Sequence, residues 1–366
     1  MSRTHKHFQH TILFLLTGIC CFHSIYAQGV NQQQKAQLYG IFNNTTTLET
    51  RIVPIVNDSQ ILLTKTDNAG FSVPDDKSTF PGNEWYGSAS LAGDPRTGQL
   101  FYADKSGTSI SLWGISTKGK HAKINGPDKS IAGHCFTKMA MGPDGYVYAI
   151  STKIDERNLS TGSETLVIRF KPCNKPGCTS IETIGYISGK DGYKNSLTYS
   201  GDMAFSAAGD LFLFGTELDT AINYYKGAHI YKISANQIKK KEKPSIISIQ
   251  YIGQIAGMGL KTGIDSTVIT GVAFEQNGSF IIAAMDKYTG TRVHFYRGKS
   301  LSEITYVTPV QLGYNMPPGF VISDLASFNL PVIAIKKMPI SNKVNQGKKN
   351  EENDWEKLVT ITRAGY

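Results

Sequence analysis

The stretch of sequence that decides the fold is Met139-Ala140-Met141-Gly142-Pro143-Asp144-Gly145-Tyr146-Val147-Tyr148. Two short apolar runs flank an Asp-Gly pair, which is among the strongest sequence signals for a tight β-hairpin because glycine readily takes the positive φ of the turn. Similar phrases occupy residues 89–102, 203–212 and 272–281, and a degraded fifth copy without the turn glycine covers 323–335. The chain therefore consists of repeated β units.

A small residue recurs at one register of the phrase, as expected where equivalent strands converge on a crowded axis. The residues are Ser90, Ala140, Ala204, Ala273 and Ala326. A third strand is predicted after each of the four clear phrases and a fourth strand after three of them. Radial repetition of four-stranded antiparallel sheets is a β-propeller. The sequence thus predicts an all-β chain with a single β-propeller domain.

Six blades are the predicted number, and five are the alternative. Residues 51–64 predict one further, worn inner hairpin, which supplies the sixth blade; with five blades, residues 51–86 form an elaborate loop instead. The sequence Leu38-Tyr39-Gly40-Ile41 echoes the third-strand sequence Leu112-Trp113-Gly114-Ile115. We therefore expect the N-terminal strand to complete a blade begun by the C-terminal residues, so that both termini close the ring.

The repeated phrase resembles that of secreted bacterial β-propellers of the broad NHL, gluconolactonase-like and TolB-like group. In that group an Ala-Phe-x-x-x-Gly-x-Leu-Tyr sequence forms the inner hairpin of each blade. The resemblance covers about residues 36–336. It implies the architecture but not the activity, because this fold hosts enzymes, binding modules and scaffolds alike.

The N-terminus has the order of a secretory signal peptide. Arg3 and Lys6 precede an apolar run over residues 12–22, and Ala27 offers a small residue at a cleavage site. The apolar run is too short to cross a bilayer core of roughly 30 Å. We expect removal of residues 1–27 and export to the periplasm, the outer surface or the medium.

The rest of the chain, residues 28–366, is expected to be the propeller domain, with 338–356 as a polar loop or flexible segment. No transmembrane segment is expected after removal of the signal. Lipid anchoring is disfavoured, because the bulky Ile19 precedes Cys20 where a lipobox has a small residue.

The composition is that of an ordinary globular protein, with 38 Lys and Arg against 29 Asp and Glu and a net charge of +9. Part of the positive charge is local, in the lysine-rich run 239–243. No aromatic residues are interleaved there for base stacking, so a solvated loop is the preferred interpretation and nucleic-acid binding is disfavoured.

The inner strands enter the axial channel two residues before the recurring small residue. The residues at this level are Ser88, Lys138, Asp202, Gly271 and Asp324. The resemblance to gluconolactonase-like lactonases implies a divalent cation held at such a channel mouth by Glu, Asn and Asp. Only Asp202 and Asp324 match that set, and a lysine between two aspartates more naturally neutralises them. We therefore predict no catalytic residue and no metal site here.

Other sequence signals for chemistry are missing. The chain contains no Gly-x-Ser-x-Gly elbow, no glycine-rich phosphate loop and no sialidase box. Tyr224 and Tyr225, predicted to lie in a loop, are the best candidates for an exposed binding pair. The favoured function is a binding module for a protein or glycan, without a cofactor. The alternative is a lactonase-like hydrolase that uses Ca²⁺ or Zn²⁺ at the channel mouth.

A local disulfide is expected between Cys173 and Cys178. Pro176-Gly177 places a turn between the two thiols, and an exported chain meets oxidising conditions. Peptide mapping without reductant should recover the two cysteines in one cross-linked peptide, with Cys135 reduced. A free thiol at either loop cysteine would contradict the prediction.

Overall fold

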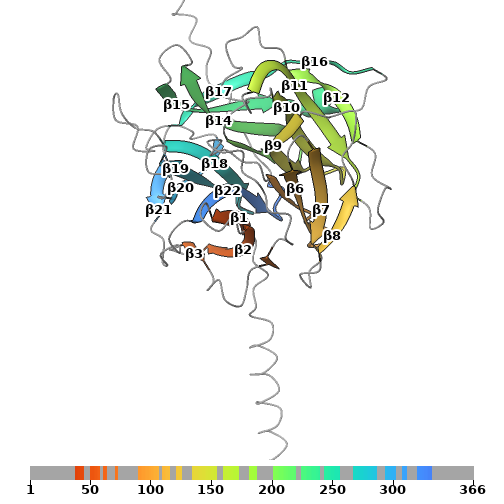
Figure 1. Ribbon diagram of the computed structural model, residues 1–366. Helices are drawn as coiled ribbons and strands as arrows, with labels where there is room; N and C mark the ends of the chain where they lie inside the picture. The colour runs from red at the N-terminus through yellow and green to blue at the C-terminus, as the bar shows by residue number, and fades with distance from the viewer. Residues whose placement is uncertain are drawn as a thin grey trace, which may run out of the picture. The chain divides into compact units, whose positions relative to one another are not determined.

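The computed structural model describes seventeen stretches of the chain (Figure 1). They are residues 38–44, 50–57, 61–63, 71–72, 90–106, 109–115, 121–125, 134–154, 160–172, 181–187, 201–219, 224–239, 243–255, 267–286, 293–301, 307–310 and 320–331. All of them lie in one compact unit, Met1–Ile333. The predicted signal peptide, the disulfide and the polar loop 338–356 lie outside the described residues.

The described residues form five sheets, which we number as blades along the chain. Blade 1 contains β5 (Ser90–Gly93), β6 (Leu100–Ser106), β7 (Ser109–Ile115) and β8 (His121–Asn125). Blade 2 contains β9 (His134–Met141), β10 (Val147–Ile154), β11 (Ser160–Phe170), β12 (Ile181–Ile187) and β16 (Ser245–Ile247). Blade 3 contains β13 (Asp202–Phe205), β14 (Leu211–Asp219), β15 (Tyr224–Ile233) and β17 (Gln250–Ile255).

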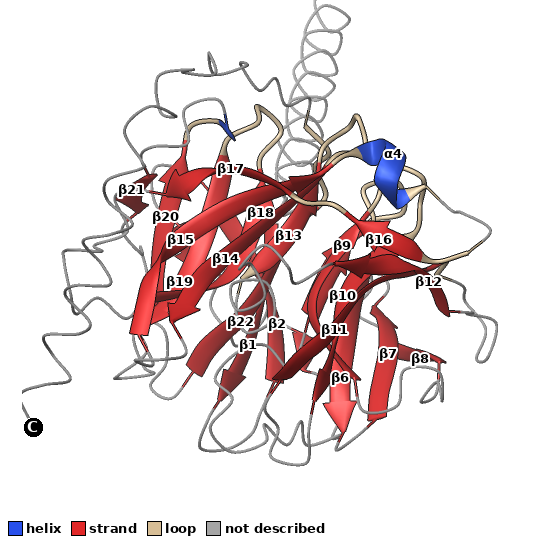
Figure 2. Ribbon diagram, turned by 90° about the horizontal axis from the view of Figure 1, so that it is seen from above, coloured by secondary structure: helices blue, strands red, loops and turns tan. Residues whose placement is uncertain are grey.

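Blades 4 and 5 complete the set. Blade 4 contains β18 (Thr267–Phe274), β19 (Phe280–Asp286), β20 (Val293–Gly298) and β21 (Val307–Val310). Blade 5 contains β22 (Phe320–Ser327), β1 (Leu38–Asn44), β2 (Thr50–Asn57), β3 (Ile61–Leu63) and β4 (Phe71–Ser72). The described part of the chain includes one short helix, α4 (Ala235–Ile238), among the strands (Figure 2). Among these residues no helix is long and apolar enough to cross a membrane.

The five innermost strands form a closed cycle. In the order β5, β9, β13, β18 and β22 each strand contacts the next, and β22 contacts β5. This arrangement confirms the β-propeller, and the described residues form five blades instead of the preferred six. The alternative gave five blades, but it made residues 51–86 a loop, whereas this segment contributes strands to blade 5. Residues 51–57 do form a hairpin arm, but β2 and β3 are outer strands of blade 5. A hairpin pattern does not by itself distinguish an inner pair from an outer pair.

Blade 5 joins the two ends of the described chain. Strand β22 pairs antiparallel with β1, and Leu38 lies opposite Ser327 and Ile41 opposite Asp324. Strand β1 then pairs with β2. The expectation that the N-terminal strand completes a blade begun by the C-terminal residues is therefore confirmed.

The hydrophobic core consists of layers between adjacent blades. One layer joins blades 1 and 2 through Ala92, Phe101, Met139 and Ile168, all of them buried. Similar layers join blades 2 and 3, blades 4 and 5, and blades 5 and 1. Because each blade is covered on both sides, its strands carry nearly continuous apolar sequences rather than a clean alternation.

Backbone hydrogen bonds of the inner turns align the repeats. The amides of Asp94, Gly142, Ser206 and Glu275 each donate across the turn that follows the innermost strand, over 2.8 to 2.9 Å. Counting back two residues from these equivalent positions reaches Ala92, Ala140, Ala204 and Ala273. The small residue of blade 1 is thus Ala92 and not Ser90. The turn of blade 1 is one residue longer than the others, which displaced the alignment made from the sequence.

A carboxylate in the inner turn meets a base on the third strand in three blades. The pairs are Arg169 with Asp144 at 3.5 Å, Lys232 with Asp210 at 3.1 Å, and Arg297 with Glu275 at 3.5 Å. The third strand of blade 1 has Gly114 at this register, opposite Phe101. In blade 1, therefore, the basic residue that pairs with the carboxylate comes from the inner turn itself.

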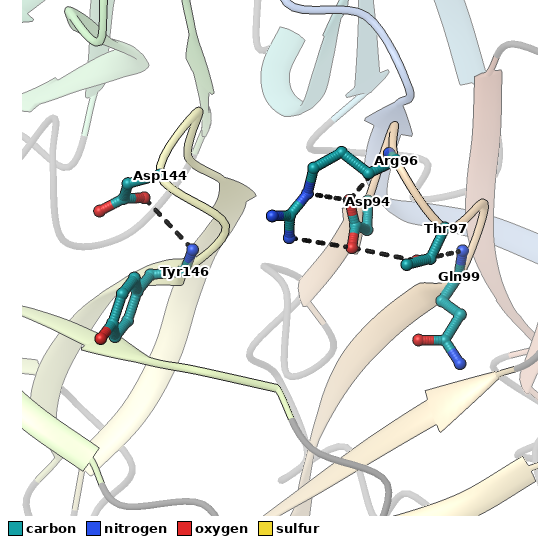
Figure 3. Close-up of polar contacts among 6 residues, drawn as sticks. All are labelled: Asp94, Arg96, Thr97, Gln99, Asp144 and Tyr146. Atoms are coloured by element: carbon teal, nitrogen blue, oxygen red, sulfur yellow. Dashed lines mark hydrogen bonds and ion pairs between the residues drawn. The ribbon is translucent and has the colours of Figure 1, made fainter.

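That base is Arg96, whose backbone amide and Nε donate to Oδ1 of Asp94 over 2.9 and 3.2 Å (Figure 3). Burial alone would raise the pKa of Asp94, but hydrogen bonds from Arg96 and Thr97 hold this pKa below its ordinary value. The guanidinium also lies against the neighbouring turn, because a Cβ added to Gly145 would come within 2.4 Å of it. Arg96 therefore links the turns of blades 1 and 2.

Closure of the ring by β1 can be tested by truncation. We expect a chain that starts at Thr45 to lose its cooperative unfolding transition, because β1 buries Leu38, Ile41 and Phe42. Each such side chain contributes about 1.5–3 kcal/mol, and together they match the free energy of unfolding of a typical domain. A chain that starts at Gln28 keeps β1 and is the control. Equal urea midpoints for the two chains would contradict the role of β1.

Candidate functional site

The residues at the entrance level of the innermost strands converge on the axis. After the correction in blade 1 they are Ser90, Lys138, Asp202, Gly271 and Asp324, one from each of β5, β9, β13, β18 and β22. Ser90, Lys138 and Asp202 are 0 % exposed and Asp324 is 2 % exposed. The sequence therefore identified Lys138, Asp202 and Asp324 at the level where they lie. Ser88 lies outside the described residues, and Ser90 takes its place in the ring.

The two aspartates tie innermost strands of neighbouring blades together. Asp324 accepts hydrogen bonds from the amide of Leu325 at 2.7 Å and from the amide of Leu91 in blade 1 at 2.6 Å. Asp202 accepts bonds from the amides of Met203 and of Val272 in blade 4, both at 2.6 Å. Each of the four carboxylate oxygens thus accepts a backbone amide. Hydrogen bonds to buried carboxyl groups are strong where water is excluded.

The remaining junctions between innermost strands are held by other kinds of contact. Ser90 Oγ donates to the carbonyl of Phe136 in blade 2 over 2.7 Å. A Cβ added to Gly271 would lie 2.5 Å from the amide nitrogen of Leu325, so only glycine lets β18 and β22 approach this closely. The positive charge of Lys138 in blade 2 acts on Asp202 in blade 3. Every junction around the axis therefore has a specific polar or steric contact.

Burial and mutual repulsion leave a proton on the carboxylate pair. Burial and the negative charge of Asp202 raise the pKa of Asp324 well above its ordinary value. Burial also raises the pKa of Asp202, although the hydrogen bond from Asp324, the backbone amides and the charge of Lys138 oppose that rise. The proton therefore resides on Asp324, which donates to an ionised Asp202. With Lys138 protonated, the buried cluster is electrically neutral, as burial requires.

A small pocket adjoins this cluster on the side of the inner turns. Its walls include Ala92, Met139, Ala204 and Leu325, and neither Asp202 nor Asp324 contributes to them. The volume accessible to water is about 30 Å³, which is room for a few water molecules and not for a sugar ring. The carboxylates are thus not presented to a substrate from this side.

For the predicted binding pair Tyr224 and Tyr225, the structure describes the backbone only. The backbone of Tyr224 and Tyr225 begins β15, opposite Asp219 and Leu218, so the pair belongs to a strand and not to a loop. Their side chains, like the loops that lead into the innermost strands, lie outside the described residues. Within the described stretches no group of three or more His, Cys, Asp or Glu is placed to hold a metal ion.

No protein-family model and no curated protein matches the chain. Among solved structures, it is similar to an engineered GH43 glycoside hydrolase with endo-xylanase and exo-arabinofuranosidase activity, at 6% identity and a TM-score of 0.41, over 63% of this chain and 42% of that one. It is also similar to a chain of a nidogen/laminin complex, at 9% identity and a TM-score of 0.40, over 79% and 97% of the two chains.

A third similar structure is an endo-arabinase from Bacteroides thetaiotaomicron VPI-5482, at 12% identity and a TM-score of 0.38, over 69% of this chain and 95% of that one. This chain spans less than half the length of the GH43 hydrolase. The strand topology described above, rather than these distant likenesses, establishes the propeller.

The buried carboxyl groups of Asp202 and Asp324 make the free energy of unfolding depend on pH. The folded pair keeps a proton that the unfolded chain releases above about pH 4. Its stabilising contribution is therefore complete below that pH and is lost as pH rises through the raised pKa of the pair. We expect the free energy of unfolding to fall between about pH 4 and neutrality, with a slope of up to about 1.4 kcal/mol per pH unit from this proton.

Urea unfolding at a series of pH values measures this slope. Asp324→Asn should flatten it and lower stability at acid pH, because an amide NH₂ cannot accept the bond from Leu91 or Leu325 that one carboxyl oxygen accepts. Asp144→Asn, in an exposed turn, is the control and should keep the slope. A slope that persists in Asp324→Asn would show that another group carries it.

Proposed function

We propose that this protein is an exported β-propeller that binds a protein or glycan partner and does not transform it. The supporting observation is that Asp202 and Asp324, the carboxyl groups at the axis in the described part of the chain, use all four oxygens in bonds to backbone amides. A general base must reach a substrate proton, but Asp202 and Asp324 are buried and neither lines the pocket beside them. Here both carboxylates instead hold the ring together.

Export is the second part of the proposal. It rests on the N-terminal order of Arg3 and Lys6, the apolar run and Ala27. In such a protein the ring of blades is the rigid scaffold, and binding residues usually lie on the loops and outer strands that the scaffold positions. The surfaces available to a partner are therefore peripheral to the axial cluster.

A double substitution at the axis separates binding from catalysis. We expect Asp202→Asn with Asp324→Asn to lower the free energy of unfolding by several kcal/mol, since each buried amide that loses its acceptor costs about 1–3 kcal/mol. The variant that remains folded at low temperature should still capture the partner of the wild-type chain from a cell-envelope extract, measured by quantitative mass spectrometry.

The same proteins should be assayed on lactone and ester substrates with and without a chelator. We expect no turnover in either condition. Hydrolysis that is sensitive to the chelator and is lost in the double variant would contradict the binding function. The protein would then be a metal-dependent hydrolase with its site at the channel mouth.

A further inference from the structure

A short segment of chain lies at the end of the pocket beside the axial cluster. The strand pairing of β22 ends at Ser327, and residues 328–331 continue from there in an irregular conformation. Asn329 and Leu330 line the pocket together with residues of the innermost strands. We call residues 328–331 the cap.

The cap crosses from one side of the ring to the other. The ring of Phe328 packs edge-on against Tyr39 of blade 5, with 5.5 Å between ring centroids. It also lies close to blade 1, because a Cβ added to Gly93 would come within 2.9 Å of it. Leu330, two residues further on, packs against the hydrophobic layer between blades 2 and 3.

Two hydrogen bonds attach the cap to further blades. Asn329 Nδ2 donates to the carbonyl of Phe274 in blade 4 over 3.3 Å. The amide of Ala207, in the inner turn of blade 3, donates to the carbonyl of Pro331 over 2.9 Å. The cap thus touches blades 1, 3, 4 and 5 and the layer between blades 2 and 3, and it covers the pocket on the side of the inner turns.

The cap is held less firmly than the ring beneath it. Residues 328–330 are half-buried, whereas Asp202 and Asp324 are buried and accept amides of neighbouring blades over 2.6 Å. Local opening occurs in segments with few buried contacts and accessible hydrogen bonds. Release of the cap also leaves the pairing of β22 intact, because that pairing ends at Ser327.

The pocket under the cap leads to the carboxyl pair. Its walls include Leu91 and Val272, whose amides donate to Asp324 and Asp202. Water that passes the cap therefore meets the residues that bind the two carboxyl groups.

We propose that the cap is a gate, which opens the axial pocket to water from the inner-turn side while the ring of innermost strands stays closed. The gate lets Asp202 and Asp324 exchange their shared proton with solvent in the folded protein. Exchange by opening of the ring itself would instead separate blades 5 and 1 or blades 3 and 4, which these carboxyl groups join. The gate and the proposed binding function are independent, so either can fail alone.

Hydrogen exchange of single backbone amides in heavy water tests the gate. In the chain from Gln28 onward, the amide of Ala207 reports release of the cap. The amides of Leu91 and Val272 report entry of water to the carboxyl pair. At low urea we expect all three rates to be nearly independent of the urea concentration, because a local opening exposes little surface.

The test variant combines Asn329→Ala with Leu330→Ala. It removes the hydrogen bond to blade 4 and the packing on the layer between blades 2 and 3. We expect exchange at Ala207, Leu91 and Val272 to become about tenfold faster, which corresponds to about 1.4 kcal/mol less free energy of opening.

Two variants serve as controls, with urea midpoints as the measure of global stability. Val307→Ala shortens a fully buried side chain on β21 of blade 4, so it should lower the midpoint and leave the three rates at low urea unchanged. Gln276→Ala removes an exposed side chain from the inner turn of blade 4 and should change neither quantity.

Three results would overturn the gate. Unchanged rates at Leu91 and Val272 in the cap variant would place the route of water at the other end of the axis, whether or not Ala207 is accelerated. Rates that rise with urea in step with global unfolding would show that the ring opens as a whole. Equal acceleration by Val307→Ala would assign the effect to global stability.

Discussion

The hydrogen bond from the amide of Leu91 to the carboxylate of Asp324 joins the first blade to the last. The ring of innermost strands is closed only if this junction forms, and the closure brings together residues 233 positions apart in sequence. The entropy of ordering such a long loop must be offset by strong contacts. The buried pair of Asp324 and Asp202 supplies such contacts, because their carboxyl groups accept four backbone amides and share one proton. The single negative charge that remains on the pair must then be compensated at the axis.

The neutral cluster of Lys138, Asp202 and Asp324 follows from that requirement. An isolated buried carboxylate would be prohibitively costly, so a second carboxylate is tolerated only with a shared proton and a nearby ammonium group. In the inner turns the negative charge of each carboxylate is likewise compensated by an ion pair. The partner is a basic residue of the third strand or, in blade 1, Arg96. Among the described residues, the buried and paired charges thus serve ring closure and turn geometry.

Much of this arrangement could be predicted from the sequence, because glycine turns and recurring small residues are local signals. The convergence of Lys138, Asp202 and Asp324 followed directly from aligning the repeats. The alignment failed in blade 1, where a longer turn hid the equivalence of Ala92 and placed Ser88 where Ser90 lies. The blade count failed because an outer hairpin over residues 50–63 has the same local pattern as an inner one. The three-residue strand β16 lies between strands of blade 3 in the sequence but pairs with β12 of blade 2, and no local sequence pattern predicts such a pairing.

Infrared spectroscopy of the carboxyl groups tests the central claim most directly, because a protonated carboxylic acid has a carbonyl band that ionised carboxylates lack. At neutral pH the wild-type chain should show this band from a buried, hydrogen-bonded carboxyl group, slow to shift in heavy water, and Asp324→Asn should abolish it. A wild-type spectrum without the band, or a band that survives in Asp324→Asn, would contradict the account of an axis closed by a proton-sharing carboxylate pair.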